Sequence, residues 1–207
     1  MAAFLQNFRN TMTLSAILAL IMIVAFGQAR GQFDMIFWQA TFRWMHVFFG
    51  ILWIGLLYYF NFVAARKTPE IPAEMRPALT KYITPEALFW FRWAALFTVL
   101  AGICVIGLRE TVVKGYAVGV LSLGFVGDAS TRKQYMLMGI GVYLALIMFI
   151  NVWGVIWPNQ KRALGIVEAD ADTKAKAART AGMFSRINTL LSLPMLTSMA
   201  MYQTLFG

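Results

Sequence analysis

Five long apolar runs constrain the fold of this chain more than any other feature of its sequence. They extend over residues 11–26, 37–64, 87–108, 135–157 and 187–206. A helix needs about 20 predominantly apolar residues to cross a bilayer, where its backbone polar groups must be satisfied within the protein. The runs therefore predict an all-α integral membrane protein, a bundle of about five transmembrane helices. We expect residues 1–207 to form a single membrane-embedded helical domain.

The segment 112–127 is apolar as well, but it is shorter and rich in glycine. It contains Gly115, Gly119, Gly124 and Gly127. Apolar segments of this length more often lie at the interface or re-enter the membrane than span it. We therefore expect one short interfacial or re-entrant segment between the third and fourth spans.

Charged residues are scarce and mostly basic. They make up 13% of the 207 residues, against about 25% in soluble globular domains. The 18 Lys and Arg residues outnumber the 9 Asp and Glu residues. This composition excludes a soluble enzyme, a disordered tail and a disulfide-stapled secreted domain. In a membrane protein, an excess of Lys and Arg is explained by their role in membrane insertion and by contact with anionic lipid. We therefore expect no nucleic-acid partner.

The basic residues divide unequally between the two sides of a five-helix topology. The side that holds the N-terminus and the loops after the second and fourth spans carries 12 of them, and the other side carries 6. Lys and Arg collect in the cytoplasmic loops of membrane proteins. We therefore expect a multi-pass protein with a cytoplasmic N-terminus and a periplasmic C-terminus.

The single histidine, His46, is the first candidate for chemistry. With one histidine and one cysteine (Cys104), the chain cannot build an intrachain disulfide, a bis-histidine haem site or a His-rich metal site. Gly50 and Trp53 follow His46 at helical spacing, so the three share one face, and Gly50 leaves room for a flat macrocycle. Arg43, one turn away, could bind a haem propionate.

This pattern has two interpretations. In one, His46, Arg43, Gly50 and Trp53 contact a cofactor, either haem, a quinone or a lipid, with His46 as a metal ligand. In the other, His46 hydrogen-bonds a neighbouring helix, and the glycines allow close helix packing. Arg92, flanked by aromatic residues, is likewise either a cofactor or anion contact or an interfacial arginine whose side chain reaches toward water.

Three amide and hydroxyl residues within the last two runs are interpreted as structural polar residues. Asn151 lies inside the fourth run and needs a partner from another helix, while Asn188 and Thr189 lie near the start of the fifth. They could line a polar interior or join helices together. No paired carboxylates, nucleophile elbow or phosphate loop occurs, so the sequence identifies no catalytic residue.

Several of these stretches resemble, in the same order, the membrane domain of bacterial urate hydroxylases, the urate oxidase N-terminal family. They are Arg43-Trp44-Met45-His46-Val47 with Trp53-Ile54-Gly55, Trp90-Phe91-Arg92-Trp93, Asn151 through Pro158-Asn159-Gln160-Lys161, and Asn188 through Leu193-Pro194. Members of the family carry a C-terminal cytochrome c domain and oxidise urate to 5-hydroxyisourate, with electrons passed to the respiratory chain. We expect this chain to correspond to the membrane domain without its cytochrome c domain. Ile187 stands where the family tends to have a histidine.

The resemblance implies a location in the bacterial inner membrane and a link to redox chemistry. We expect an accessory or structural transmembrane subunit of a membrane redox complex, in contact with the bilayer and with other membrane subunits or a cytochrome c. One alternative is a membrane urate-oxidising enzyme that passes electrons to a separate cytochrome c. Another is a single-haem b protein that uses His46. Haem b and a bound phospholipid are the candidate ligands.

Overall fold

The computed structural model describes residues 2–206, and five long helices lie over the five apolar runs. These five helices are α2 (Phe8–Arg30), α3 (Met35–Tyr58), α6 (Thr84–Val112), α8 (Arg132–Ile150) and α10 (Ala171–Leu205). The shorter α-helices are α1 (Ala2–Leu5), α4 (Ala65–Lys67), α5 (Arg76–Ala78), α7 (Tyr116–Leu121) and α9 (Trp157–Ala163). Two 3₁₀ turns are η2 (Thr68–Glu70) and η4 (Ala129–Thr131). Three π-helical segments are η1 (Tyr59–Ala64), η3 (Leu79–Ile83) and η5 (Asn151–Ile156).

Joined end to end, these elements form four rods that are long and apolar enough to cross a membrane among the described residues. The rods are Phe8–Arg30, Met35–Glu70, Arg76–Val112 and Ala129–Ala163. They confirm an all-α membrane bundle. The fifth long helix, α10, is not one of the four, since polar residues interrupt its apolar stretch. That α10 also crosses the membrane stays a prediction.

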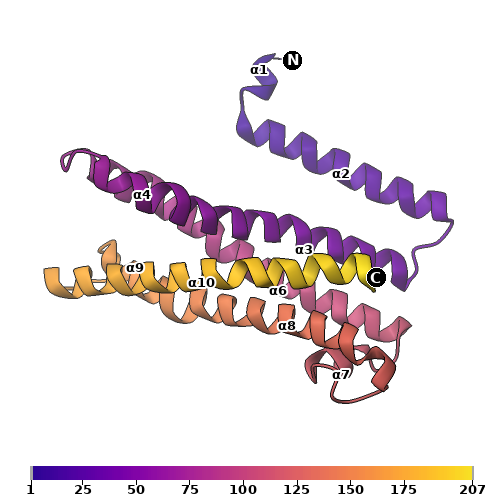
Figure 1. The fold of residues 1–207 in the computed structure, drawn as a ribbon. Coiled ribbons are helices and arrows are strands. Elements are labelled where there is room, and N and C mark those ends of the chain that lie inside the picture. Colours follow the sequence, from indigo (N-terminus) through magenta and orange to yellow (C-terminus); the bar gives the residue numbers. More distant parts are fainter. Residues whose placement is uncertain (1, 207) are drawn as a thin grey trace.

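Two antiparallel helix pairs form the main bundle (Figure 1). The first pair is α3 with α6, and the second is α8 with α10. The core lies where the pairs meet, and its fully or almost fully buried residues include Leu57, Ala95, Met148, Val152 and Ala181. All four long helices therefore contribute to one hydrophobic core.

Helix α2 stands apart from this bundle (Figure 1). Among its residues only Gly27 is buried, and large apolar side chains such as Leu20 and Ile21 are exposed. The left-handed Gly31 ends the helix, and a short connection leads into α3. In a bilayer, the apolar surface of α2 is available to lipid or to another protein chain.

The segment between α6 and α8 forms the short helix α7, which packs against α8. Turns at Gly115 and Gly124 have positive φ angles, which glycine adopts without steric cost. The helices approach closely at Gly119, where a Cβ would collide with the ring of Tyr135, and at Gly139, where it would meet the Val120 carbonyl. The short connecting segment is thus as expected; its depth in a membrane stays a prediction.

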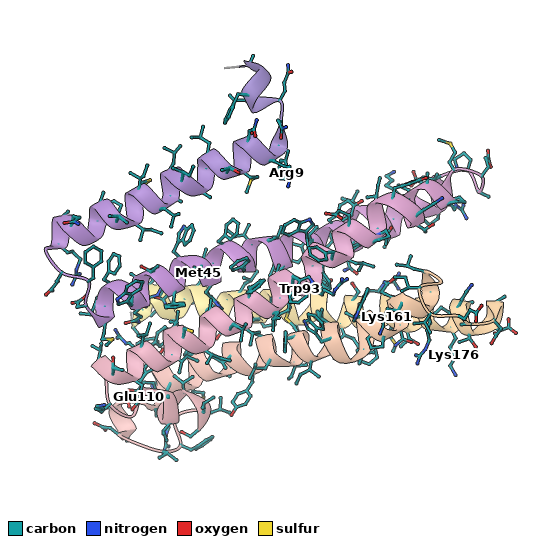
Figure 2. All side chains as sticks on the ribbon, turned by 180° about the vertical axis from the view of Figure 1, so that it is seen from behind. Arg9, Met45, Trp93, Glu110, Lys161 and Lys176 are labelled. Carbon is teal, nitrogen blue, oxygen red and sulfur yellow. The ribbon has the colours of Figure 1, made fainter. Side chains whose placement is uncertain are left out.

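Basic residues are more numerous at one end of the bundle than at the other. Lys161 and Lys176 lie together at one end, and Glu110 lies at the other (Figure 2). The loops that join α3 to α6 and α9 to α10 both lie at the end that contains the two lysines, which we call the basic end (Figures 1 and 2). The fold therefore gathers the loops assigned from sequence to the cytoplasmic side, although the orientation itself stays a prediction.

The contact between α7 and α8 predicts opposite effects of two glycine substitutions. Gly139→Ala should lower the free energy of unfolding by about 1–3 kcal/mol, because the new methyl group would overlap the backbone of α7. Gly107→Ala on α6 is the control, since no atom lies within 4 Å of its added Cβ. It should leave stability unchanged or raise it by up to about 1 kcal/mol. Unfolding in detergent micelles would compare them, and equal stability of the two variants would contradict the described packing.

Candidate functional site

His46 lies on α3 and faces α6. Its Nδ1 atom is 2.8 Å from the carbonyl oxygen of Thr98. Because a carbonyl oxygen only accepts hydrogen bonds, Nδ1 carries the proton in this contact. In the neutral ring, Nε2 is then left as the acceptor or metal-ligating nitrogen. The structure thus gives His46 the helix-to-helix hydrogen bond of the packing interpretation and leaves one nitrogen for other chemistry.

Of the two glycines beside His46, Gly102 on α6 is the closely packed one. A Cβ on Gly102 would lie 3.0 Å from Nδ1 of His46, so an alanine there would require the ring to shift by a few tenths of an ångström. Gly50 faces the methyl group of Thr98, at a distance of 3.8 Å from an added Cβ. The face that Gly50 shares with His46 is therefore covered by α6. Any cofactor contact of His46 would have to involve Nε2.

Arg43 lies one turn from His46 on α3. Its Nε atom is buried and has no hydrogen-bond partner among the described residues. Near this end of the bundle, the guanidinium of Arg109 lies 5.8 Å from the centre of the Tyr116 ring. Burial, together with the neighbouring Tyr202 hydroxyl, raises the pKa of Tyr116 above its ordinary value, so the phenol stays protonated at neutral pH.

The remaining two predicted cofactor contacts lie farther along the bundle. Trp53 is almost fully buried in the hydrophobic core. Arg92 stacks on Trp157, with its guanidinium carbon 3.9 Å from the ring centre. Six residues separate Arg92 from Thr98, the level of His46, which corresponds to about 9 Å of helix rise. The structure therefore brings His46 and Gly50 to one contact but places Arg43 and Arg92 on opposite sides of it.

Asn151 and Asn188 join α8 to α10 inside the bundle. Nδ2 of Asn151 donates to Oδ1 of Asn188 at 2.8 Å, and Nδ2 of Asn188 donates to the Met148 carbonyl at 2.9 Å. Both side chains are buried. Asn151 begins the π-helical segment η5. The inter-helix partner that the sequence required for Asn151 is therefore Asn188.

A polar stripe on α10 extends this connection. Ser192 lies 3.0 Å from the hydroxyl of Tyr58, and Ser185 accepts a hydrogen bond from Asn61 at 2.8 Å. Together with Asn188, these serines follow the i, i+3, i+7 spacing of one helix face. That spacing is visible in the sequence, but Tyr58 and Asn61, their partners on α3 and η1, are not identifiable from it.

Thr189 lies off this stripe. Its hydroxyl donates to the Ser185 carbonyl of its own helix at 3.1 Å. A second contact to α8 comes instead from Ser198, whose hydroxyl donates to the Leu137 carbonyl. Among the residues interpreted as structural, Asn151 and Asn188 therefore join two helices, whereas Thr189 bonds within α10.

The C-terminal half of the chain, which contains these contacts, matches a known family. Residues 109–206 match the family model described as urate oxidase N-terminal. This part of the chain, just under half of its length, is therefore similar to that family. No curated protein and no solved structure matches the chain.

The family match covers part of the resemblance seen in the sequence. Asn151, Pro158-Asn159-Gln160-Lys161 and Asn188 through Pro194 lie inside the matched residues. The stretches around His46 and Arg92 lie outside them. The matched residues therefore include the amide pair that fastens α10 to α8, and the cofactor role of His46 stays a prediction.

The amide pair predicts unequal effects at two adjacent polar residues of α10. Asn188→Ala removes both inter-helix hydrogen bonds and should destabilise the protein by about 1–2 kcal/mol, since hydrogen bonds between membrane helices contribute about 0.6 kcal/mol each and up to about 1.7. Thr189→Ala is the matched control and should change stability by less than about 0.5 kcal/mol. Equal losses in detergent unfolding experiments would mean that the amide pair does not hold α10 in place.

Proposed function

We propose that this protein is an accessory or structural transmembrane subunit of a membrane redox complex, related to urate hydroxylases and located in the bacterial inner membrane. The family of residues 109–206 supports the link to urate hydroxylases. The four apolar rods support a protein embedded in the bilayer.

The observation that carries the subunit role is the position of α2. This 23-residue apolar helix leaves the bundle and keeps almost all of its surface exposed (Figure 1). A helix of this kind can bury its surface against a helix of another subunit without any rearrangement of the remaining four. Packing between membrane helices is driven by shape and van der Waals contact, for which α2 offers its whole length.

The polar groups inside the bundle fit the same role. His46 is bonded to Thr98, Asn151 to Asn188, and Tyr58 to Ser192. Each of these bonds connects two helices. These side chains thus stabilise the association of α3, α6, α8 and α10 and give the chain a packed bundle beside which α2 stays free.

Photo-crosslinking tests this role directly. A photoreactive residue in place of Leu20 on α2 should crosslink in native membranes to a second membrane subunit or a cytochrome c, identified by mass spectrometry. The matched control is the same residue in place of Leu193, which is also exposed but lies on α10 in the bundle. Crosslinks to lipid alone at Leu20, with the protein purifying without partners in mild detergent, would contradict the subunit role.

A single-haem b protein is the second candidate, and the Nδ1 contact of His46 favours it. A histidine that ligates a metal usually donates its other ring N–H to a carbonyl or carboxylate, as His46 does toward Thr98. Nε2 of His46 could therefore serve as an axial ligand of a haem iron. A bound haem would supply one-electron transfer. Urate oxidation with a separate cytochrome c rests on the family description.

Optical spectroscopy separates this candidate from the subunit role. If His46 ligates haem, the purified protein should show a Soret band that is lost in His46→Ala but retained in Met45→Leu, a control at the neighbouring position. Both variants should elute as the wild type does. A wild-type protein without a Soret band, purified from haem-replete cells, would rule the haem candidate out.

A further inference from the structure

A cavity of about 230 Å³ lies near the basic end of the bundle, between helix α10 and the three rods Met35–Glu70, Arg76–Val112 and Ala129–Ala163. Residues of η1 and α4, the start of α6, η5 with α9, and α10 line it. Two π-helical segments, η1 and η5, border this space. The extra residue in a π-helical turn widens a helix, and such turns occur frequently at functional sites.

The lining changes from polar to largely apolar along the bundle axis, and its two deeper polar side chains, Asn61 and Ser185, bond to each other. On three of the rods, a polar lining residue lies near the loop and a large apolar one lies deeper toward the middle of the rod. These pairs are Thr68 and Phe60, Thr84 and Phe91, and Gln160 and Ile156. A ligand that matches this lining is amphiphilic, with a polar end near the loops and an apolar end within the membrane.

The only charged residue in the lining is Arg186 of α10. The two ion pairs among the described residues involve Arg30 and Lys67, so Arg186 has no carboxylate partner there. Within the described part of the chain, the side chains of Gln160 and Thr84 also form no hydrogen bond. The cavity therefore presents one cation and two uncommitted polar groups, which suits an anionic oxygen-rich headgroup.

On α10, small residues keep the space open. Ala181 and Gly182 are part of the lining, and no atom lies within 4 Å of a Cβ added to Gly182. A larger side chain at this position would therefore enter the cavity without a collision with the backbone. Gly182 thus offers a way to fill the site while α10 stays intact.

We propose that this cavity binds one anionic phospholipid, with its phosphate at Arg186 and Gln160 and part of an acyl chain along Phe60 and Phe91. The basic residues at this end of the bundle favour anionic lipid, because clusters of Lys and Arg between membrane helices attract such headgroups. The deeper apolar lining favours a lipid over a free phosphate, because a free phosphate has no apolar group that could pack against it. The proposal is independent of the redox role.

Native mass spectrometry of the delipidated full chain tests this site with phosphatidylglycerol as the probe. One molecule should bind per chain, and phosphatidylcholine with the same acyl chains should bind more weakly. Arg186→Gln should weaken phosphatidylglycerol binding about tenfold, the effect of one charge-assisted hydrogen bond. Gly182→Phe should abolish the single bound lipid, because its ring would occupy the cavity.

The matched control is Arg179→Gln, which removes the same charge from an exposed position of α10 outside the lining. It should leave binding unchanged. The thermal stability of each variant is measured as well, and only variants as stable as the wild type are compared. A loss of lipid binding then does not result from unfolding. Equal weakening by Arg179→Gln and Arg186→Gln, or unchanged binding in Gly182→Phe, would overturn the site. Displacement of the lipid by glycerol phosphate at similar concentration would show a site for a soluble anion and overturn the lipid assignment.

Discussion

The arrangement of this protein depends on hydrogen bonds between polar side chains of α10 and the rest of the bundle. A bilayer offers no water to polar groups, so each must find a partner in the protein. Asn188 satisfies Asn151 and the Met148 carbonyl, and Ser185 and Ser192 bond to residues of the α3 rod. The least apolar of the long helices is therefore held in the bundle by its polar face.

This arrangement gives the protein a packed helical bundle and, outside its core, surfaces that other molecules can contact. Inside the packed bundle, the side chains of Asn151, Asn188 and Ser192 are hydrogen-bonded between helices, and α2 leaves its apolar surface free (Figure 1). At the basic end, η1 and η5 widen their helices and border a cavity lined by Arg186, which has no carboxylate partner among the described residues. A protein built in this way is suited to connect other components, a second subunit along α2 and a lipid in the cavity.

The sequence allowed the helices to be predicted because apolar runs of membrane length leave few alternatives. It also required a partner for Asn151, since a buried amide is costly without one. The identity of that partner, the contact of His46 with Thr98 and the separation of Arg43 from Arg92 depend on how distant helices align. The cavity depends on π-helical turns at Tyr59 and Asn151, and no residue pattern in the sequence marks such turns.

The central claim is that α10 crosses the membrane although its composition alone does not require it. Reporter fusions of alkaline phosphatase and green fluorescent protein, placed separately at Gly165 in the α9–α10 connection and after Gly207, test this claim whatever the orientation of the protein. We expect the two positions to lie on opposite sides of the membrane, with Gly165 on the side of the N-terminus. Both positions on the same side would contradict the crossing and the role of the Asn151–Asn188 pair as a contact within the bilayer.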